Sequence, residues 1–263
     1  MTKIAIHGAT GRMGRRLLDL GFQDQDLQIV AALASSNSQF LGQDAGELAG
    51  HPSQGVEIAC STDVSIDVVI DFSKPDGADH ILDYCVDKKI ALVLATTGLE
   101  APTVNKIETA CQQIPIVLAA NTSLAVNLTM KLTQMAAGAL KGHPAGVDVE
   151  IMETHHRYKA DSPSGTALKF GQVIHEAMGP LVPTHGREGM LGERPRNEIG
   201  YHAIRAGDDP GQHTILFGML GEKIELKVAA SNRDCYASGA LAAAKFLARK
   251  DPGMYSMFDV LGL

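Results

Sequence analysis

The chain has no tryptophan, only 5% aromatic residues, no long apolar run and no excess of positive charge. Its 23 lysines and arginines are outnumbered by 30 acidic residues, which gives a formal net charge of -7. Proteins that hold nucleic-acid backbones need a basic surface, so this balance argues against a nucleic-acid partner. The first apolar residues run into a glycine turn too early for a signal peptide, and no later run is long enough to span a membrane. We therefore expect a cytoplasmic protein with no membrane partner.

Cysteine is scarce as well, and its four positions are far apart in the sequence. Cys60, Cys85, Cys111 and Cys235 form no Cys-x-x-Cys pair, and none has a basic group as its sequence neighbour that would activate it as a nucleophile. We therefore expect reduced cysteines that serve as packing residues, neither disulfide-bonded nor catalytic.

Short runs rich in β-branched residues alternate with amphipathic segments in the first half of the chain. We expect strands at 3–6, 27–33, 66–72, 90–95 and 114–120, and a helix over 77–87 among the segments between them. This alternation predicts an α/β fold, with a Rossmann-like parallel sheet that carries helices on both faces. The length of 263 residues favours two domains over one.

The second half of the chain has a different pattern. A long helix is expected over 123–140, with its apolar face formed by Leu124, Leu128, Leu132, Met135 and Ala136. Further strands are expected at 147–152, 198–205, 213–217 and 223–230, helices at 163–178 and 236–249, and a long loop at 179–197. Consecutive strands without intervening helices predict a second, α+β domain with an antiparallel or mixed sheet.

A glycine-rich turn, His7-Gly8-Ala9-Thr10-Gly11-Arg12-Met13-Gly14, follows the first expected strand and opens the first expected helix. Glycines allow a tight turn and close approach of a ligand, and the free amides of the helix start favour a pyrophosphate. The pattern therefore predicts a dinucleotide site. The second expected strand ends in Ala34-Ser35-Ser36-Asn37, without the acidic residue that usually contacts the ribose. We expect NADPH to be accepted at least as well as NADH, with Arg12 near the ribose phosphate.

Two other strand ends fall at the same edge of the predicted sheet. They are Ala95-Thr96-Thr97-Gly98 and Ala119-Ala120-Asn121-Thr122, and their small side chains and amides suit a nicotinamide ring. Ordinary strand-to-helix turns with a polar cap are the alternative interpretation.

Residues 153–168, ETHHRYKADSPSGTAL, concentrate cationic and proton-transferring side chains. His155 and His156 are neighbours at an expected strand end, so their side chains point to opposite sides. With no third ligand at metal spacing, we expect no metal site. Arg157 and Lys159 add positive charge, and either His155 or Lys159 suits proton transfer. The alternative is a solvated basic loop.

The Ser162-Pro163-Ser164-Gly165-Thr166 segment that follows looks like a helix start. Serine suits the cap and proline the first turn, which would leave the amides of Ser164, Gly165 and Thr166 free to bind an anion such as a carboxylate.

Together these segments resemble the dihydrodipicolinate reductase family, also called 4-hydroxy-tetrahydrodipicolinate reductases, nearly from end to end. The most specific element is Glu-x-His-His-Arg-x-Lys followed by Ser-Gly-Thr-Ala-Leu. The other matching segments are Gly8 to Gly14, Asp44-Ala45-Gly46-Glu47-Leu48, Ile70-Asp71-Phe72-Ser73-Lys74-Pro75, Thr96-Thr97-Gly98, Asn232-Arg233 and Ser238-Gly239-Ala240-Leu241. The resemblance implies reduction of a cyclic unsaturated dicarboxylate by NAD(P)H with loss of water, giving tetrahydrodipicolinate on the route to diaminopimelate and lysine. Another two-domain amino-acid dehydrogenase and a non-catalytic NAD(P) sensor are the alternatives.

The same resemblance implies roles for individual residues. His155 would be the general acid or base, Lys159 would donate a proton or polarise the ring nitrogen, and His156, Gly165 and Thr166 would bind substrate carboxylates. Coenzyme contacts would fall on Gly8 to Met13, Ala95 to Thr97 and Ala119 to Thr122. The family often has an acidic residue where Ala34 stands and can have an arginine where Ser35 stands, so dual coenzyme use with NADPH slightly favoured is expected.

The resemblance also implies an organisation for the whole chain. Residues 1–123 and 234–263 would form the dinucleotide-binding domain, and 124–233 the substrate-binding and oligomerisation domain. The second domain's sheet would join a homotetramer.

Overall fold

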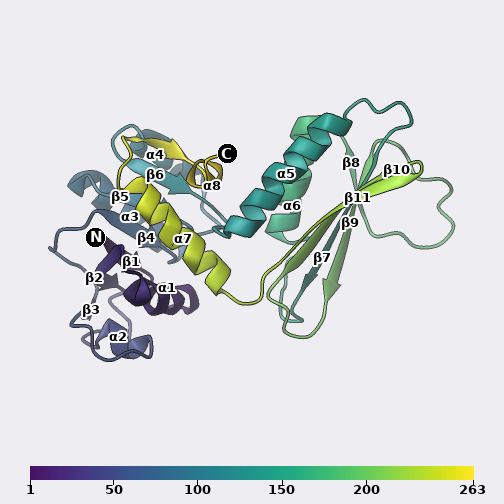
Figure 1. Ribbon diagram of the computed structural model, residues 1–263. Coiled ribbons are helices and arrows are strands. Elements are labelled where there is room, and N and C mark those ends of the chain that lie inside the picture. Colours follow the sequence, from purple (N-terminus) through teal and green to yellow (C-terminus); the bar gives the residue numbers. More distant parts are fainter. The chain divides into compact units, whose positions relative to one another are not determined.

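The computed structural model describes residues 1–263, which form two compact units (Figure 1). Unit 1 comprises Met1–Leu124 and Arg233–Leu263, and unit 2 comprises Ala125–Asn232. Unit 2 is therefore an uninterrupted insertion into a discontinuous unit 1. No helix in the structure is both long enough and apolar enough to cross a bilayer.

Unit 1 contains a 7-stranded parallel sheet, which confirms the predicted Rossmann-like architecture. Its order is β12-β6-β5-β4-β1-β2-β3. The strands are β1 (Thr2–His7), β2 (Leu27–Leu33), β3 (Ile58–Ala59), β4 (Val68–Asp71), β5 (Ala91–Leu94), β6 (Pro115–Leu118) and β12 (Gly253–Tyr255). Neither β3 nor β12 was anticipated from the sequence, because two or three residues are too few to show a period.

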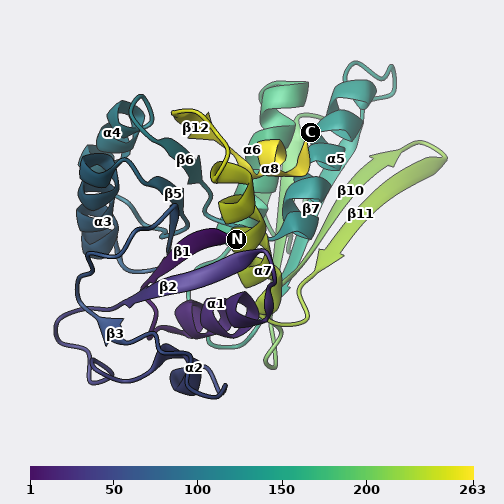
Figure 2. The ribbon, with the colours of Figure 1, turned by 60° about the vertical axis from the view of Figure 1, so that its left-hand side comes forward.

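Helices cover both faces of this sheet, as Figure 2 shows. One face packs on α1 (Arg12–Gln23) and on α7 (Asp234–Leu247), which returns from the far end of the sequence, and the other on α3 (Pro75–Lys88) and α4 (Ala101–Ala110). Each strand supplies alternate residues to the two cores, so Ile4 and Ile6 face α1 and α7 whereas Ala5 faces the other way. Two short helices, α2 (Ala45–Leu48) and α8 (Met257–Leu261), complete the unit.

Unit 2 contains a mixed sheet of order β11-β10-β7-β9-β8, as the consecutive late strands predicted. Its strands are β7 (Asp148–His155), β8 (Val182–His185), β9 (Glu198–Arg205), β10 (Gln212–Met219) and β11 (Glu222–Ala229). Strand β7 pairs parallel with β9 and antiparallel with β10. Strand β8 lies inside the 179–197 segment that was expected to be a loop; this exposed edge strand contains a proline and has no apolar alternation.

One face of the second sheet carries α5 (Leu124–Leu140) and α6 (Gly165–Met178), and its other face has no helix (Figure 1). The prediction for the apolar face of α5 was wrong: Leu128, Leu132 and Met135 are 43%, 43% and 61% exposed. The helix instead buries a row of smaller residues that includes Thr133 and Ala137. Both rows have helical spacing, so periodicity alone could not choose between them.

The four cysteines are free. Cys85 lies buried in α3, and burial raises the pKa of its thiol. Cys60 is exposed, so the expectation that all four are packing residues was wrong at that position.

Candidate active site

The end of β7 carries a buried pair of ionisable side chains. Alternation along the strand turns Val149, Ile151, Glu153 and His155 toward the face that the helices cover, where Glu153 is 2% and His155 8% exposed. A glutamate is rarely buried so completely unless its charge is paired. The Nδ1 atom of His155 lies 2.5 Å from Oε2 of Glu153, so the carboxylate fixes which way the imidazole faces.

Glu153 accepts hydrogen bonds on both of its oxygens. Arg205, at the end of the neighbouring strand β9, donates to both from Nη1 and Nη2 at 2.7 Å, and the Ser164 amide donates to Oε1 at 3.1 Å. Burial opposes the charged form, but the hydrogen bonds from Arg205, His155 and Ser164 outweigh it and lower the pKa of Glu153. The hydrogen bonds therefore favour the charged form of the carboxylate, which links His155, Arg205 and the start of α6.

The start of α6 differs from the sequence prediction by two residues. The N-cap is Ser164, whose hydroxyl accepts from the Ala167 amide, and Pro163 precedes the helix after a cis peptide bond to Ser162. The Ser164 amide was expected to be free for a ligand, but it is bonded to Glu153. The Gly165 amide lies in the first turn, where no intrahelical acceptor is available, and Thr166 follows it.

Gly165 has space around it. A Cβ added at this position would meet nothing within 4 Å, so the fold itself would accept a larger residue. The absence of a side chain therefore leaves the first turn of α6 open to an incoming group.

His156 and Lys159 follow β7 in a loop that is tied to the segment before β10. The His156 amide donates to the Asp209 carbonyl, and the Lys159 amide donates back to the His156 carbonyl. The Nδ1 atom of His156 is buried and has no hydrogen-bond partner, so it is available to a ligand. Lys159 places its ammonium 2.8 Å from Asp161, and this hydrogen bond lowers the pKa of Asp161.

A second buried histidine lies next to the first. The ring centroids of His155 and His213 are 5.3 Å apart in an edge-to-face arrangement, and Nε2 of His213 lies 3.0 Å from Oγ of Ser164. Burial lowers the pKa of His213 to about 4, and the charge on His155 lowers it further. The lowered pKa keeps the His213 imidazole neutral at pH 7, next to His155 and Glu153.

The structure thus brings His155, His156, Lys159, Gly165 and Thr166 to one end of unit 2, around the end of β7 and the start of α6. Sequence reasoning missed four partners: Glu153, Asp161, Arg205 and His213. Only Glu153 left a local signal, because it continues the buried row of β7 in place of an apolar residue.

The predicted coenzyme segments all follow parallel strands of unit 1. The glycine turn follows β1, residues 95–97 follow β5 and residues 119–122 follow β6, so all three lie at the carboxyl edge of the sheet. The amides of Gly8 and Ala9 both donate to the Leu33 carbonyl and are used by the fold. Helix α1 begins after Gly11, which has no side chain to cap it. Its first amides therefore remain available to an anion.

The glycines of this turn serve different purposes. A Cβ at Gly8 would lie 2.6 Å from the Phe72 carbonyl oxygen, and one at Gly14 would lie 2.2 Å from the Gly8 carbonyl oxygen, so the fold requires both glycines. A Cβ at Gly11 would meet only the Gly8 oxygen, at 3.2 Å, which is tight without being prohibitive. The backbone at Gly11 is therefore accessible in the way a pyrophosphate would need.

Two threonines predicted to contact the coenzyme have their hydroxyls engaged. Thr96 donates to the buried Asp71 at 2.6 Å, and Thr122 donates to the Tyr236 carbonyl of α7 at 2.7 Å. Thr122 is 1% exposed, so its side chain serves packing. Ala120 and Thr97 are exposed, whereas Ala119 is buried.

The segment after β2 contains no acidic side chain. Ala34 is buried, and Ser35, Ser36 and Asn37 are exposed. Arg12, in the first turn of α1, is also exposed, and Arg15 stacks its guanidinium 4.8 Å from the ring centroid of Phe40.

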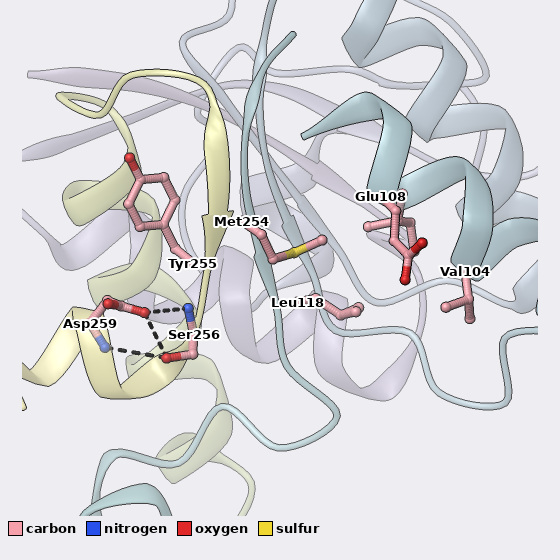
Figure 3. A pocket seen from close by; sticks show the side chains of 8 residues that line it. Val104, Glu108, Leu118, Met254, Tyr255, Ser256 and Asp259 are labelled. Atoms are coloured by element: carbon pink, nitrogen blue, oxygen red, sulfur yellow. Dashed lines mark hydrogen bonds between the residues drawn. The ribbon is translucent and has the colours of Figure 1, made fainter. Parts of the chain in front are cut away.

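A separate pocket of unit 1 lies between α4, β6 and the C-terminal residues (Figure 3). It is lined by Val104, Ile107, Glu108, Leu118, Met254, Tyr255, Ser256 and Asp259. Asp259 is engaged in the capping box of α8 with Ser256. None of the predicted site residues lines this pocket.

Two family profiles match consecutive parts of the chain. The profile described as dihydrodipicolinate reductase, N-terminus, matches residues 2–122, and the profile for the C-terminus of the same family matches residues 125–261. A 4-hydroxy-tetrahydrodipicolinate reductase of Rhodopirellula baltica is 54% identical, over 99% of this chain and 96% of that protein. Another, of Alkalilimnicola ehrlichii, is 44% identical over 100% of this chain and 99% of that protein.

Solved structures share the fold. A dipicolinate-bound dihydrodipicolinate reductase from Paenisporosarcina sp. TG-14 has a TM-score of 0.80 at 24% identity, covering 98% of both chains. An amine dehydrogenase from Mycobacterium smegmatis has a TM-score of 0.60 at 12% identity, covering 97% of this chain and 95% of that one. The architecture of the two units therefore recurs in reductases and dehydrogenases of widely different sequence.

Proposed function

Since this chain belongs to the dihydrodipicolinate reductase family and reduces 4-hydroxy-tetrahydrodipicolinate with NAD(P)H and loss of water, we propose that His155 and Lys159 carry the proton chemistry of that reaction. The product is tetrahydrodipicolinate, on the diaminopimelate route to lysine. The observation that carries the proposal is the 2.5 Å hydrogen bond from Nδ1 of His155 to Glu153. It leaves Nε2 as the nitrogen that exchanges protons with a ligand.

Loss of water and reduction both require proton transfers. The departing hydroxyl gains a proton while the neighbouring ring carbon gives one up, so water leaves and a carbon–carbon double bond forms. NAD(P)H, when bound, supplies a hydride to an unsaturated carbon of the ring, and the electron pair released from the double bond takes up a proton, so that one hydride and one proton are consumed overall. His155 acts as the acid–base group, and the Lys159 ammonium donates to the ring nitrogen. Asp161 keeps that ammonium in place with its 2.8 Å hydrogen bond.

The substrate carboxylates bind at His156 and at the first turn of α6. The unpartnered Nδ1 of His156 and the amides of Gly165 and Thr166 supply donors, and the positive end of the helix dipole favours an anion. The structurally similar reductase from Paenisporosarcina was solved with dipicolinate bound, which is a planar ring with two carboxylates. This supports a small dicarboxylate as the ligand of the present chain.

Two variants separate the proton-transfer role from the binding role. His155→Gln keeps the coenzyme site and should lose most of kcat, roughly a hundredfold or more. Gly165→Val should raise the KM for substrate with a much smaller effect on kcat, because the added methyl groups block the helix amides while the fold has room for them. Both kinetic constants come from following NAD(P)H absorbance with freshly prepared substrate. Unchanged kcat in His155→Gln would show that another group transfers the proton.

The coenzyme binds at the carboxyl edge of unit 1, on Gly8, Ala9, Thr10, Gly11, Arg12 and Met13, with contacts from residues 95–97 and 119–122. Support comes from the uncapped start of α1 and from the accessible backbone at Gly11. NADPH is used at least as well as NADH, because the exposed Ser35, Ser36 and Asn37 offer hydroxyls and an amide but no carboxylate to the 2′-phosphate. A kcat/KM for NADH far above that for NADPH would overturn this preference.

Unit 1 then binds the dinucleotide, and unit 2 binds the substrate and forms the contacts of a cytoplasmic homotetramer. The helix-free face of the second sheet supports the assembly, because it presents Met152, Leu216 and Ile204, the last 53% exposed. Light scattering after size-exclusion chromatography tests it. A tetramer for the unchanged chain and smaller species for Met152→Lys are expected, and a monomeric unchanged chain would refute the assembly.

A further inference from the structure

The carboxyl group of Asp71 is buried at the carboxyl edge of the first sheet. Asp71 is the last residue of β4 and is 0% exposed. It accepts from three donors: Nδ1 of His7 at 2.6 Å, the Thr96 hydroxyl at 2.6 Å and the Ser73 amide at 3.2 Å. A buried carboxylate needs such partners, because burial without them costs several kcal/mol.

Two of these donors come from the strands on either side of β4. His7 ends β1 and pairs with Asp71 in the parallel ladder, and Thr96 follows β5, whose Leu94 also pairs with Asp71. Both donors are linked to segments that the coenzyme is proposed to contact: His7 directly precedes Gly8, and Thr96 lies within the 95–97 turn. One carboxyl group therefore joins the two turns at the end of the ladder, where the Phe72 amide still donates to the His7 carbonyl and the Ala95 amide to the Asp71 carbonyl.

Gly77 leaves room for the His7 imidazole beside Asp71. A Cβ added at Gly77, in the first turn of α3, would lie 2.8 Å from the Ser73 hydroxyl and 3.2 Å from Cε1 of His7. The imidazole thus packs closely against Gly77, where a side chain would crowd both His7 and Ser73. Its side chain is 17% exposed, whereas that of Asp71 is 0% exposed.

We propose that Asp71, through His7 and Thr96, is a positioning residue for the coenzyme, because it sets the separation between the glycine turn and the 95–97 turn. This inference rests on the proposed coenzyme site. The segment expected near the 2′-phosphate follows β2, which lies on the opposite side of β1 from β4. Asp71 therefore acts on the part of the dinucleotide that NADH and NADPH share.

The test removes one hydrogen-bond donor to Asp71 without changing the shape of the side chain that carries it. Thr96→Val replaces the hydroxyl with a methyl group, and it should weaken binding of NADH and of NADPH by the same factor, roughly tenfold for a lost hydrogen bond to a charged group. Thr96→Ser retains the hydroxyl and should bind both coenzymes nearly as the unchanged chain does. Dissociation constants come from coenzyme fluorescence on the full-length protein without substrate, so turnover does not enter the result.

A second histidine–carboxylate pair of unit 1 supplies the control. His51 lies in the loop after α2, and its Nε2 atom is 2.7 Å from Oδ1 of Asp19 in α1. His51→Asn should therefore leave coenzyme binding unchanged. Unaltered binding in Thr96→Val, equal losses in the valine and serine variants, or a loss confined to one coenzyme would each overturn the role of Asp71. Gly11→Val separates the two proposals. If it binds coenzyme normally, the coenzyme site itself is wrong; if it loses binding while Thr96→Val does not, only the positioning role fails.

Discussion

Replacing His213 with glutamine should flatten the dependence of stability on pH. His213 is 5% exposed, and burial lowers its pKa from 6.5 to about 4. Between these two values the unfolded chain binds a proton at this side chain and the folded chain does not. Stability rises with pH wherever the unfolded state binds more protons, so the unchanged protein loses stability as the pH falls from 6.5 toward 4.

The size of this loss follows from the shift. Each unit of difference in pKa is worth about 1.4 kcal/mol, so His213 alone should account for roughly 3 kcal/mol between neutral pH and about pH 4. In His213→Gln this part of the slope disappears, whatever constant offset the substitution adds at pH 7. Titrating groups that lie away from His213 contribute equally to both proteins and cancel in the difference.

The measurement is urea unfolding followed by circular dichroism, at several pH values between about 7 and 4.5. Thr214→Val is the control, because it changes the neighbouring position of β10, which faces the other side of the sheet and carries no titrating group. The difference in free energy of unfolding between the unchanged chain and His213→Gln should change with pH, whereas the difference for Thr214→Val should not. Parallel curves for all three proteins would refute the assignment of a buried neutral imidazole.

Two further predictions concern residues that sequence reasoning passed over. Glu153→Gln should lower kcat by roughly a hundredfold, since it removes the anion that orients His155. Glu150→Gln should leave kcat unchanged, because that carboxylate of the same strand is paired instead with Arg187, Arg194 and His202. Equal kcat values for the two variants in steady-state assays would refute the orienting role. Gly171→Ala should destabilise the protein by roughly 1–3 kcal/mol, because its Cβ would lie 1.7 Å from the Tyr201 hydroxyl oxygen. Adding Tyr201→Phe should restore part of the lost thermal stability, because the hydroxyl is removed while the ring carbon Cζ, 2.8 Å from the added Cβ, stays; no recovery would mean that the hydroxyl clash is relieved elsewhere.

The parallel sheet was predictable because its strands are apolar runs bounded by clear turns. Strand β2 was expected at 27–33 and has those bounds, and β9 was likewise expected at its observed bounds, 198–205. The glycine turn was equally predictable, since its glycines lie between a strand and a helix. Periodicity carries this information whenever an element is long enough to repeat.

Choices that depend on tertiary contacts were not predictable. Ser162 and Ser164 are both suitable N-cap residues. The Ser164 amide donates to the Glu153 carboxylate, and the helix starts with Ser164 as its N-cap. Arg205 lies 52 residues from Glu153 in the sequence, so nothing local connects them. The partners of the site are set by the pairing of β7 with β9 and β10, and that pairing cannot be read from any single segment.

The return of α7 to unit 1 bears on how the molecule assembles during translation. Leu241 and Leu247 complete the core that contains Ile4 and Ile6, and Arg16 of α1 bonds to Asp234 at the start of α7. A nascent chain therefore has one side of its first sheet only partly covered, by α1, until about residue 247 has left the ribosome. Unit 2 is contiguous and is complete in sequence by Asn232. The part synthesised in the middle is thus the first that can finish folding, and the part that emerged first waits until α7 has been synthesised.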